Sequence, residues 1–404
     1  MYKTLAGTTA IIMLLLAFTA CGTPVTTTLL PSENQGKQPI GNSIDTGFAH
    51  MLGFIPYSFL EEYDIWYGDP NTIKNRYGLD EFKSIADTGN LTPEERRNVV
   101  SQIGEVPVPY FSNNYFQIAS LIGWDGFMVD RAVFHETPPP WGFSVAEGNF
   151  EESIIIDKLL QQDYQKAEYG SHSYYWKNED MEIDILSDVG KQVMAQLNRV
   201  ALIDNVIITA SATEILTPLL DTMKGGGLSI ADNAAGMAIA NSMGDIQGCV
   251  LLTPNRLLKV SPGSDAPVFD LPAAESWGML HKYSLLGIGY RNDGQERDWV
   301  ISLYFQDKDD AASDAVELKT RLDNYIFNTH LEQAERTPLT SKFAIDEPVV
   351  KEYEEGATLT ISCRYLPETA DSDSLFTLII QTRDLLFLVN DPSPYLVEEL
   401  KNRD

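Results

Sequence analysis

The sequence predicts an α+β fold: two copies of a strand-strand-helix-strand-strand unit with mainly antiparallel sheets, preceded by a signal peptide and a flexible tether. Three observations lead to this prediction. Two apolar runs within residues 282–305 flank an Asn-Asp-Gly turn at 292–294, which is a strong hairpin signal. An amphipathic helical pattern follows at 308–330. The same order of patterns occurs earlier in the chain, at 129–210.

The second copy shows its elements most clearly. Every second residue from Trp299 to Phe305 is large and apolar, which is the period of a strand. Asp307 stands where a helix cap is expected, and Asp309 and Asp310 suit the positive N-terminal end of the helix dipole. Two further strands, expected at 357–365 and 375–389, complete the unit.

The first copy follows the same order with little residue identity. Its helix is expected at 149–163, where Asn149 and Glu152 have the spacing of a capping box before an apolar face. Its strands are expected at 129–136, 141–148, 165–176 and 198–210.

Residues between the copies are expected to form two helices and a strand, at 212–223, 230–243 and 246–253. A linker rich in proline, serine and aspartate follows at 261–276. Because such composition is typical of connecting segments, the linker is the predicted boundary between two α+β domains, 44–260 and 277–404.

The first 20 residues have the layout of a signal peptide, with Lys3, a short apolar stretch and small residues at the end. The apolar stretch is too short to cross a hydrocarbon core ~30 Å thick, which takes about 20 apolar residues. The run Phe18-Thr19-Ala20-Cys21 resembles the lipobox of bacterial lipoproteins, although Phe18 departs from the usual leucine. The alternative is an ordinary signal peptide cleaved near Ala20, followed by a chance cysteine.

The lipobox resemblance implies that Cys21 is the lipidated first residue of a mature lipoprotein, with palmitate among the expected acyl groups. The tract at 21–43, rich in threonine and proline, has little to bury and is typical of a flexible tether. We therefore expect a protein anchored by lipid on the extracytoplasmic face of the cell membrane or envelope.

Composition limits the choice of partners. The net charge is −29, and affinity for phosphate backbones comes from Lys and Arg, so nucleic acid is not an expected partner. A hydrophobic content of 44% allows a sizeable core. Besides Cys21, only Cys249 and Cys363 are present, each in a strand-like segment that suggests a small buried hydrophobe. Whether these two cysteines pair stays open.

The stretch 141–243 is similar to a group of uncharacterised bacterial envelope proteins. The resemblance rests on "WGFSVAEGNFEES", "AEYGSHSYYW" and "DNVIITASATEILTPLL…LSIADN". These segments share with the group a glycine-aromatic strand, a Gly-x-Phe start of a helix, a Tyr-Gly strand and a strand-helix run. The resemblance implies an exported, duplicated α+β body, and it transfers no catalytic residues.

Motifs for catalysis and cofactor binding are incomplete. Ser144 and Ser229 each lie in a Gly-x-Ser-x-Ala stretch, but neither is expected at the sharp strand-to-helix turn of a nucleophile elbow. Lys224 precedes the glycine run 225–227, the reverse of the P-loop order, and 287–289 lacks the third glycine of a dinucleotide fingerprint. No catalytic residue and no cofactor is expected from these motifs.

Metal-ligand spacings are also incomplete. The five histidines lie far apart, without a His-x-x-x-His pair. The acidic clusters 178–184 and 306–314 lack the residue order of an EF-hand loop. We expect a solvated loop in the first cluster, a helix N-terminus in the second, and no metal site.

Aromatic residues are the remaining candidate for a binding site. Trp141, Tyr174 and Trp176 lie on strands expected to be neighbours, and exposed rings there would form a stacking platform for a sugar or a Pro-rich peptide. The alternative is that these rings are part of the core. Strand alternation directs Tyr175 to the face opposite Tyr174 and Trp176, so at least one ring is expected to pack inside.

Two functions from different classes follow. The first is a membrane-anchored, non-catalytic binding or scaffold lipoprotein, whose partner is an envelope protein, a peptide or a glycan. The alternative is an extracytoplasmic hydrolase or cation-dependent enzyme with a site assembled from distant residues.

Overall fold

A computed structural model describes residues 46–109, 115–136, 142–254, 280–327, 337–366 and 389. Contacts divide the chain into two compact units, Met1–Asn42 and Ser43–Asp404, and every described residue belongs to the second unit. In that unit, helices pack on a 13-stranded sheet, and all strand pairs among the described residues are antiparallel. The predicted α+β class with mainly antiparallel strands is confirmed.

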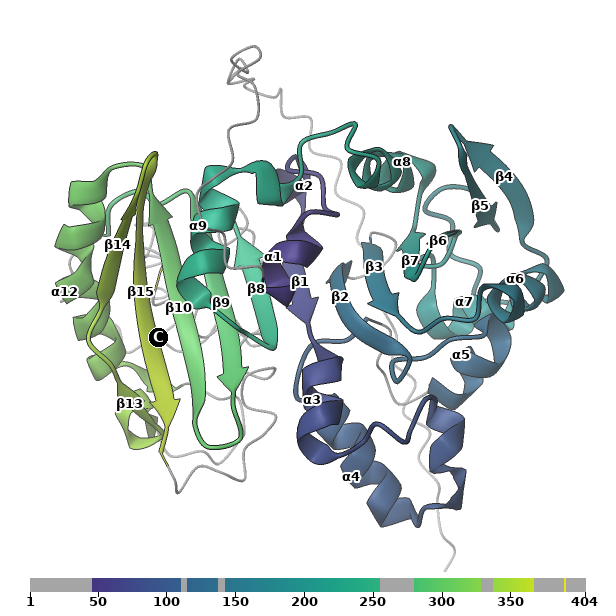
Figure 1. Cartoon of the computed structure of the whole chain (residues 1–404), viewed down its shortest axis with the longest axis horizontal. Coiled ribbons are helices and arrows are strands. Elements are labelled where there is room, and N and C mark those ends of the chain that lie inside the picture. Colours follow the sequence, from purple (N-terminus) through teal and green to yellow (C-terminus); the bar gives the residue numbers. More distant parts are fainter. Residues whose placement is uncertain are drawn as a thin grey trace, which may run out of the picture. The chain divides into compact units, whose positions relative to one another are not determined.

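The large sheet has the strand order β13-β15-β10-β9-β8-β1-β2-β3-β7-β6-β5-β4, and β14 also pairs with β15. Figure 1 shows the strands side by side in this order. Their bounds are β1 (Ile65–Gly68), β2 (Val129–Glu136), β3 (Gly142–Gly148), β4 (Gln165–Tyr169), β5 (His172–Trp176), β6 (Arg199–Ile203), β7 (Val206–Ala210), β8 (Gly248–Leu252), β9 (Leu285–Asn292), β10 (Arg297–Phe305), β13 (Phe343–Ile345), β14 (Val349–Tyr353) and β15 (Gly356–Tyr365). A separate pair joins β11 (Ile326–Phe327) to β12 (Thr337–Pro338).

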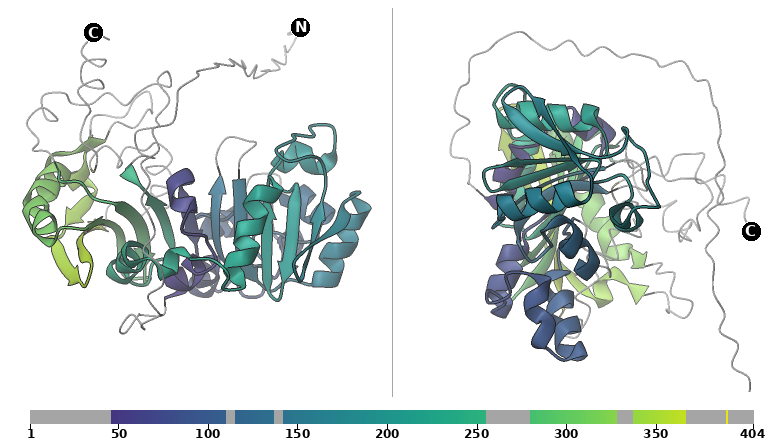
Figure 2. Two further views of the ribbon diagram at one scale, coloured as in Figure 1. Left: turned by 90° about the horizontal axis from the view of Figure 1, so that it is seen from above. Right: turned by 90° about the vertical axis from the view of Figure 1, so that its right-hand side faces the viewer.

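Helices cover both faces of the sheet, as Figure 2 shows. The first face packs against α1 (Gly47–Leu52), α2 (Phe59–Glu62), α8 (Thr213–Met223) and α9 (Ala234–Met243) in one large apolar cluster. The second face packs against α3 (Pro70–Tyr77), α4 (Pro93–Ile103), α5 (Tyr115–Ile122), α6 (Glu152–Gln161), α7 (Asp188–Val193) and α12 (Lys308–Asn324). Short 3-10 turns occur at Ile85–Asn90, Ile230–Asp232 and Leu339–Ser341.

The two predicted copies can be compared only in part, because the last predicted strand of the second copy, 375–389, lies outside the described residues apart from residue 389. In the first copy, β3 pairs with β7, and β7 forms a hairpin with β6. In the second copy, β10 pairs with β15, and β15 forms a hairpin with β14. The helix of each copy, α6 or α12, follows the first hairpin. Both regions thus share a hairpin, a helix and a later hairpin whose last strand pairs with the first hairpin, whereas β14 was not predicted and the superposition of 129–210 on 282–389 stays a prediction.

Each copy also has a helix and a strand in front of it that the patterns did not assign to it. The order α1, β1 precedes the first copy, and α9, β8 precedes the second. Strands β1 and β8 pair antiparallel, with Ile65 opposite Leu251, and helices α1 and α9 are in contact. Antiparallel pairing of equivalent strands relates the two copies by a local twofold axis perpendicular to the sheet.

Two predicted strands are in fact hairpins. The segment 165–176 turns back at Gly170 to give β4 and β5, and 198–210 turns back at Asp204 to give β6 and β7. Both turns contain a residue with positive φ, 60° at Gly170 and 51° at Asp204. A period of two alone cannot distinguish one long strand from two short strands joined by a two-residue turn.

Helix starts follow the predicted caps in part. Asp307 accepts a hydrogen bond from the Asp309 N–H, 2.9 Å, and caps α12 as expected. The capping box predicted for Asn149 and Glu152 is wrong, because α6 begins at Glu152 and its N-cap residue makes no side-chain bond. The Asn149 N–H is instead held by the Met128 carbonyl, 3.1 Å, at the end of β3.

The regions on either side of the predicted linker share one sheet, because β8 pairs with β9. The linker itself, 261–276, and the predicted strand at 375–389, apart from residue 389, lie outside the described residues. Cys249 and Cys363 are unpaired and fully buried, and they point into the apolar clusters on opposite faces of the sheet. That placement rules out a disulfide between them within this fold.

Candidate functional site

Three aromatic rings share the first face of the sheet at the β4–β5 hairpin. The two-residue turn places Tyr169 opposite His172, so Tyr169 lies on the same face as Tyr174 and Trp176. Tyr169 and Tyr174 are diagonal neighbours across the two strands, a spacing that aromatic side chains can bridge. We call Tyr169, Tyr174 and Trp176 the aromatic face.

All three rings are half-buried. Tyr169 and Tyr174 pack their inner sides against the apolar cluster under α8 and leave part of each ring exposed. Tyr175 points to the other face and is buried against α6, as strand alternation predicts. Of the predicted platform, Tyr174 and Trp176 are therefore brought together, and Trp141 lies outside the described residues.

Two cations lie over the ends of the aromatic face. The guanidinium of Arg199 is 5.7 Å from the ring centroid of Trp176, and Lys224 Nζ is 5.7 Å from that of Tyr169. The Tyr169 hydroxyl donates a hydrogen bond to Asp221, 2.9 Å, and this bond raises the pKa of the Tyr169 phenol. These contacts restrict the rotamers of the two outer rings.

Arg199 is held in place by several acceptors at once. It donates to Thr213 Oγ1 at 2.9 Å and to the Asn178 carbonyl at 3.0 Å, and it pairs with Asp180 at 2.5 Å. The Asp180 carboxylate also accepts the Thr213 N–H, 2.8 Å, at the first residue of α8. The acidic cluster 178–184 thus forms a loop that caps a helix, in agreement with the sequence interpretation of this segment as a loop.

The arrangement is suited to binding. Partly exposed rings can stack on a flat ligand, and the carboxylates of Asp180 and Asp221 accept hydrogen bonds from hydroxyl or ammonium groups. Both carboxylates are already oriented by protein partners, so a ligand would meet fixed acceptors rather than mobile side chains.

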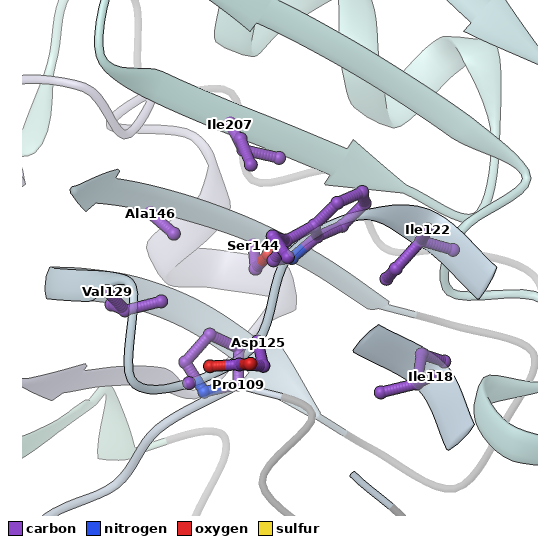
Figure 3. A pocket seen from close by; sticks show the side chains of 10 residues that line it. Pro109, Ile118, Ile122, Asp125, Val129, Ser144, Ala146 and Ile207 are labelled. Carbon is purple, nitrogen blue, oxygen red and sulfur yellow. The ribbon is translucent and has the colours of Figure 1, made fainter. Parts of the chain in front are cut away.

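A small apolar cavity lies on the second face, between α5 and strands β2, β3 and β7 (Figure 3). Its polar lining groups have partners: Ser144 is bonded to Thr209, 3.0 Å, and Asp125 accepts the N–H groups of Ile85 and Phe127. Burial raises the pKa of Asp125. The space open to the centre of a water molecule is only ≈ 10 Å³, about enough for one water, so this cavity is a packing gap rather than a substrate site.

Among the residues that the structure describes, Ser144, Ser229 and His281 do not form a catalytic triad. Ser144 lies within β3, and Ser229 is engaged in a capping box with Asp232, both as expected. His281 Nδ1 contacts both Asp314, 2.6 Å, and Ser313, 3.2 Å. In a triad the serine and the carboxylate contact different ring nitrogens, so this group has the wrong geometry.

A half-buried polar cluster links β2 to β3 and to the start of α3. Arg131 on β2 pairs with Asp69, 3.4 Å, and with Glu147 on β3, 3.7 Å. Asp69 also caps α3 through the Thr72 N–H, 2.8 Å, and its pKa is raised by burial. A Cβ on Gly47 would lie 2.6 Å from the Arg131 side chain, so the start of α1 depends on glycine. These contacts account for the cluster as structural.

A surface hollow of ≈ 460 Å³ lies between the β9–β10 turn and the end of β15. Its Arg364 is held by Asp346 at 2.7 Å. The rim reaches Leu366, where that described range ends, and no site is built on it. Within the described ranges, no group of three or more His, Cys, Asp or Glu residues is placed to hold a metal ion.

Sequence reasoning missed Tyr169, because a single strand over 165–176 would place it on the face opposite Tyr174. The Tyr-Gly pair at 169–170, with a glycine suited to positive φ, was the signal for the turn. Arg199, Lys224 and Asp180 come from distant segments, and no local pattern joins them to the rings.

Comparisons with known proteins add little. No protein-family model and no curated protein matches the chain. A solved structure described as crystal form I of TP0453 covers 82% of this chain and 97% of its own length, with 7% identity and a TM-score of 0.31. At that score the likeness carries no argument about the site. None of the described helices is long and apolar enough to cross a membrane, and Cys21 lies outside the described residues.

Proposed function

We propose that this chain is a lipid-anchored protein on the extracytoplasmic face of the cell envelope, and that it binds a ligand through its aromatic face without catalysing a reaction. The observation that carries the binding role is the row of half-buried rings, Tyr169, Tyr174 and Trp176, held by fixed cations. Each of these rings keeps part of its surface open, and an open ring face is able to stack on a flat ligand.

The proposed anchor is a lipid on Cys21, the first residue after the apolar signal stretch. The proposed tether is the tract at 21–43, rich in threonine and proline. A random coil of about 20 residues spans roughly 25 Å, so such a tether would let the body reach ligands beside the membrane.

A glycan is the ligand class that the aromatic face favours. Sugar rings present a C–H face that stacks on aromatic rings, and their hydroxyl groups donate to carboxylates such as Asp180 and Asp221. The net charge of −29 disfavours a phosphate-rich or strongly acidic ligand.

Binding is tested by co-sedimentation of the detergent-extracted protein with insoluble envelope glycan. We expect Trp176→Ala and Tyr174→Ala to lose about tenfold in affinity, because each removes a stacking ring worth ~1 kcal/mol or more. Tyr57→Ala is the matched control, since Tyr57 is 41% exposed but lies outside the aromatic face.

Three results would contradict this proposal in different ways. Equal loss in the Tyr57 control would show that the aromatic face is not the site. Binding to a proline-rich peptide but not to glycan would keep the binding role and replace the ligand class. Turnover of esterase, phosphatase, peptidase or glycosidase substrates that is lost with one pocket residue would favour the alternative, an extracytoplasmic hydrolase or cation-dependent enzyme.

The anchor is tested separately by metabolic labelling with a radioactive fatty acid. Cys21→Ser is expected to abolish the label and to release the protein from membranes or leave it uncleaved. The double variant Cys249→Ala/Cys363→Ala is expected to keep the label, because both thiols are buried. A Cys21→Ser protein that stays lipid-labelled would refute the anchor and leave the ligand site unaffected.

A further inference from the structure

We propose that two copies of this chain associate through β4, the last strand of the large sheet, by pairing their β4 strands antiparallel about Ala167. Among the described strands, β4 pairs only with β5, so its other side is a sheet edge (Figure 1). Two features of β4 carry the proposal: which of its N–H and C=O groups point away from the sheet, and the order of charges along the strand. The lipid anchor plays no part in it.

The backbone groups that face the open side belong to Lys166 and Glu168. The pair Tyr169 and His172 flanks a two-residue turn, so these two residues exchange hydrogen bonds. Along β4, every second residue then forms backbone hydrogen bonds with β5. The N–H and C=O groups of Gln165, Ala167 and Tyr169 therefore point toward β5. The N–H and C=O groups of Lys166 and Glu168 are therefore the ones that point away from the sheet.

The charges on this edge are complementary to themselves. If a second β4 pairs antiparallel with Ala167 opposite Ala167 of the other copy, Lys166 falls opposite Glu168 of that copy, and Glu168 opposite its Lys166. Both residues are exposed, and neither has an ion-pair partner among the described residues. One register thus creates two cross-strand ion pairs, and opposite charges directly across a strand pair are stabilising.

The same register satisfies the backbone. Lys166 of each copy forms a backbone hydrogen-bonded pair with Glu168 of the other copy. The outward-pointing N–H and C=O groups of both residues therefore all gain partners. Ala167 then meets its counterpart as a non-hydrogen-bonded pair with Cα atoms about 4.5 Å apart, and its small side chain suits that close approach. On the first face, Gln165 lies opposite Tyr169 of the other copy.

A second copy fits this edge better than an unrelated strand. Charged residues normally protect an exposed strand edge. When another strand approaches, they are repelled by like charges or lose their hydration, and both effects disfavour pairing. A Lys and a Glu placed symmetrically about one residue give no such protection against self-pairing. The −29 net charge opposes association, but at physiological ionic strength screening limits the repulsion to about 8 Å.

The twofold axis of this pairing is perpendicular to the sheet, so both copies keep their first faces on the same side. Tyr169 of each copy then lies beside the shared edge. Two aromatic faces would form one continuous surface, able to bind a longer ligand at two points.

Cysteine cross-linking tests the register in the full chain. Ala167→Cys places two thiols opposite each other, within the Cα separation of about 4.4–6.8 Å that a disulfide requires. We expect oxidation of this variant in membranes to give a disulfide-linked homodimer, with the wild-type chain as baseline. Ser171→Cys is the matched control, because this exposed residue at the hairpin tip lies several residues from the axis. A homodimer yield for Ala167→Cys no higher than for Ser171→Cys, or cross-linking only to another protein, would overturn the proposal.

Charge exchange tests the ion pairs independently. Lys166→Glu puts like charges opposite each other twice in the dimer and is expected to weaken association about tenfold. The double variant Lys166→Glu/Glu168→Lys restores both pairs with exchanged signs and is expected to recover the wild-type dimerisation constant. Association is measured by sedimentation of the detergent-extracted chain. Failure of the double variant to recover would refute the register, and an unchanged single variant would refute the interface.

Discussion

Asp180 is expected to contribute more to stability than an exposed acidic residue normally does, because one carboxylate has two tasks. It accepts the Thr213 N–H at the start of α8, where the N-cap residue Ala212 makes no side-chain bond. It also pairs with Arg199, whose side chain is 6% exposed. Asp180→Ala removes both interactions and is expected to destabilise the fold.

The magnitude follows from the two tasks. Loss of a helix cap costs about 1 kcal/mol. Loss of the charged partner of a buried guanidinium adds ~1–2 kcal/mol, reduced from the fully buried case because the Asp180 side chain is 47% exposed and Arg199 keeps Thr213 and backbone acceptors. The expected total for Asp180→Ala is about 2–3 kcal/mol.

Two further variants separate these terms. Asp180→Asn keeps a cap oxygen but loses the charge, so we expect about 1–2 kcal/mol. Asp188→Ala is the control, because Asp188 also pairs with a cation, Lys191 at 3.0 Å, but both side chains are more than half exposed. That exposed pair is expected to contribute at most ~1 kcal/mol.

Urea unfolding of the detergent-extracted chain, followed by fluorescence and circular dichroism, measures these differences if the slopes stay constant. A loss for Asp180→Ala no larger than for Asp188→Ala would refute the reasoning. Equal losses for the Asn and Ala variants would show that the cap contributes nothing. In the binding assay, Asp180→Ala is also expected to weaken glycan binding, since the ligand then loses the acceptor that this carboxylate is proposed to supply.

Three other outcomes are expected. Gly287→Ala should destabilise the fold by about 1–3 kcal/mol, because a Cβ there would lie 2.7 Å from Ile239 and 2.6 Å from Met243 on α9. Gly89→Ala is the control: it has open space around it and should be neutral or slightly stabilising in urea unfolding. The hydrogen bond to Asp314 raises the pKa of His281 above its usual 6.5. Wild type should therefore be more stable than His281→Gln by the largest amount below pH 6.5, and this difference should disappear as pH rises through the elevated pKa. A difference that grows with pH would contradict this. Burial raises the pKa of the Cys363 thiol to about 12 and also raises the pKa of the Cys249 thiol. Both thiols should therefore react with a thiol reagent only when the protein unfolds. Rapid labelling of the native protein at neutral pH would show that the sheet opens around the labelled cysteine.

Local signals in the sequence were enough for the first hairpin and the helix start of the second copy, but β13 and β14 were not predicted. The Asn-Asp-Gly turn at 292–294 and the Asp307 cap act between neighbouring residues, and the structure has the hairpin and α12 where these signals place them. Gly287 and Gly289 failed as a cofactor motif, and the structure gives the physical reason for their presence. Added Cβ atoms would collide with side chains of α9, so these glycines let the helix lie close to β9.

The candidate site was predicted only in part, because its contacts join distant segments. Tyr174 and Trp176 could be assigned to one face by alternation alone. The turn at Gly170 brings Tyr169 to the same face, and packing of α8 brings Lys224 and Asp221 to the hairpin. The pairing of β1 with β8 was also invisible, since two four- or five-residue strands in different halves carry no signal of their mutual register.

That central pairing has a consequence for the order in which the chain folds. Because β1 bonds to β8 across the interval from Ile65 to Leu251, the first copy is complete in sequence long before its inner edge has a partner. During synthesis from the N-terminus, β1 can pair with β2, but its other edge gains its partner only when β8 appears. Closing so long a loop is slow, and an open strand edge is prone to aggregation meanwhile. Truncation after β7 and before β8 should therefore yield an insoluble fragment rather than a stable half-molecule.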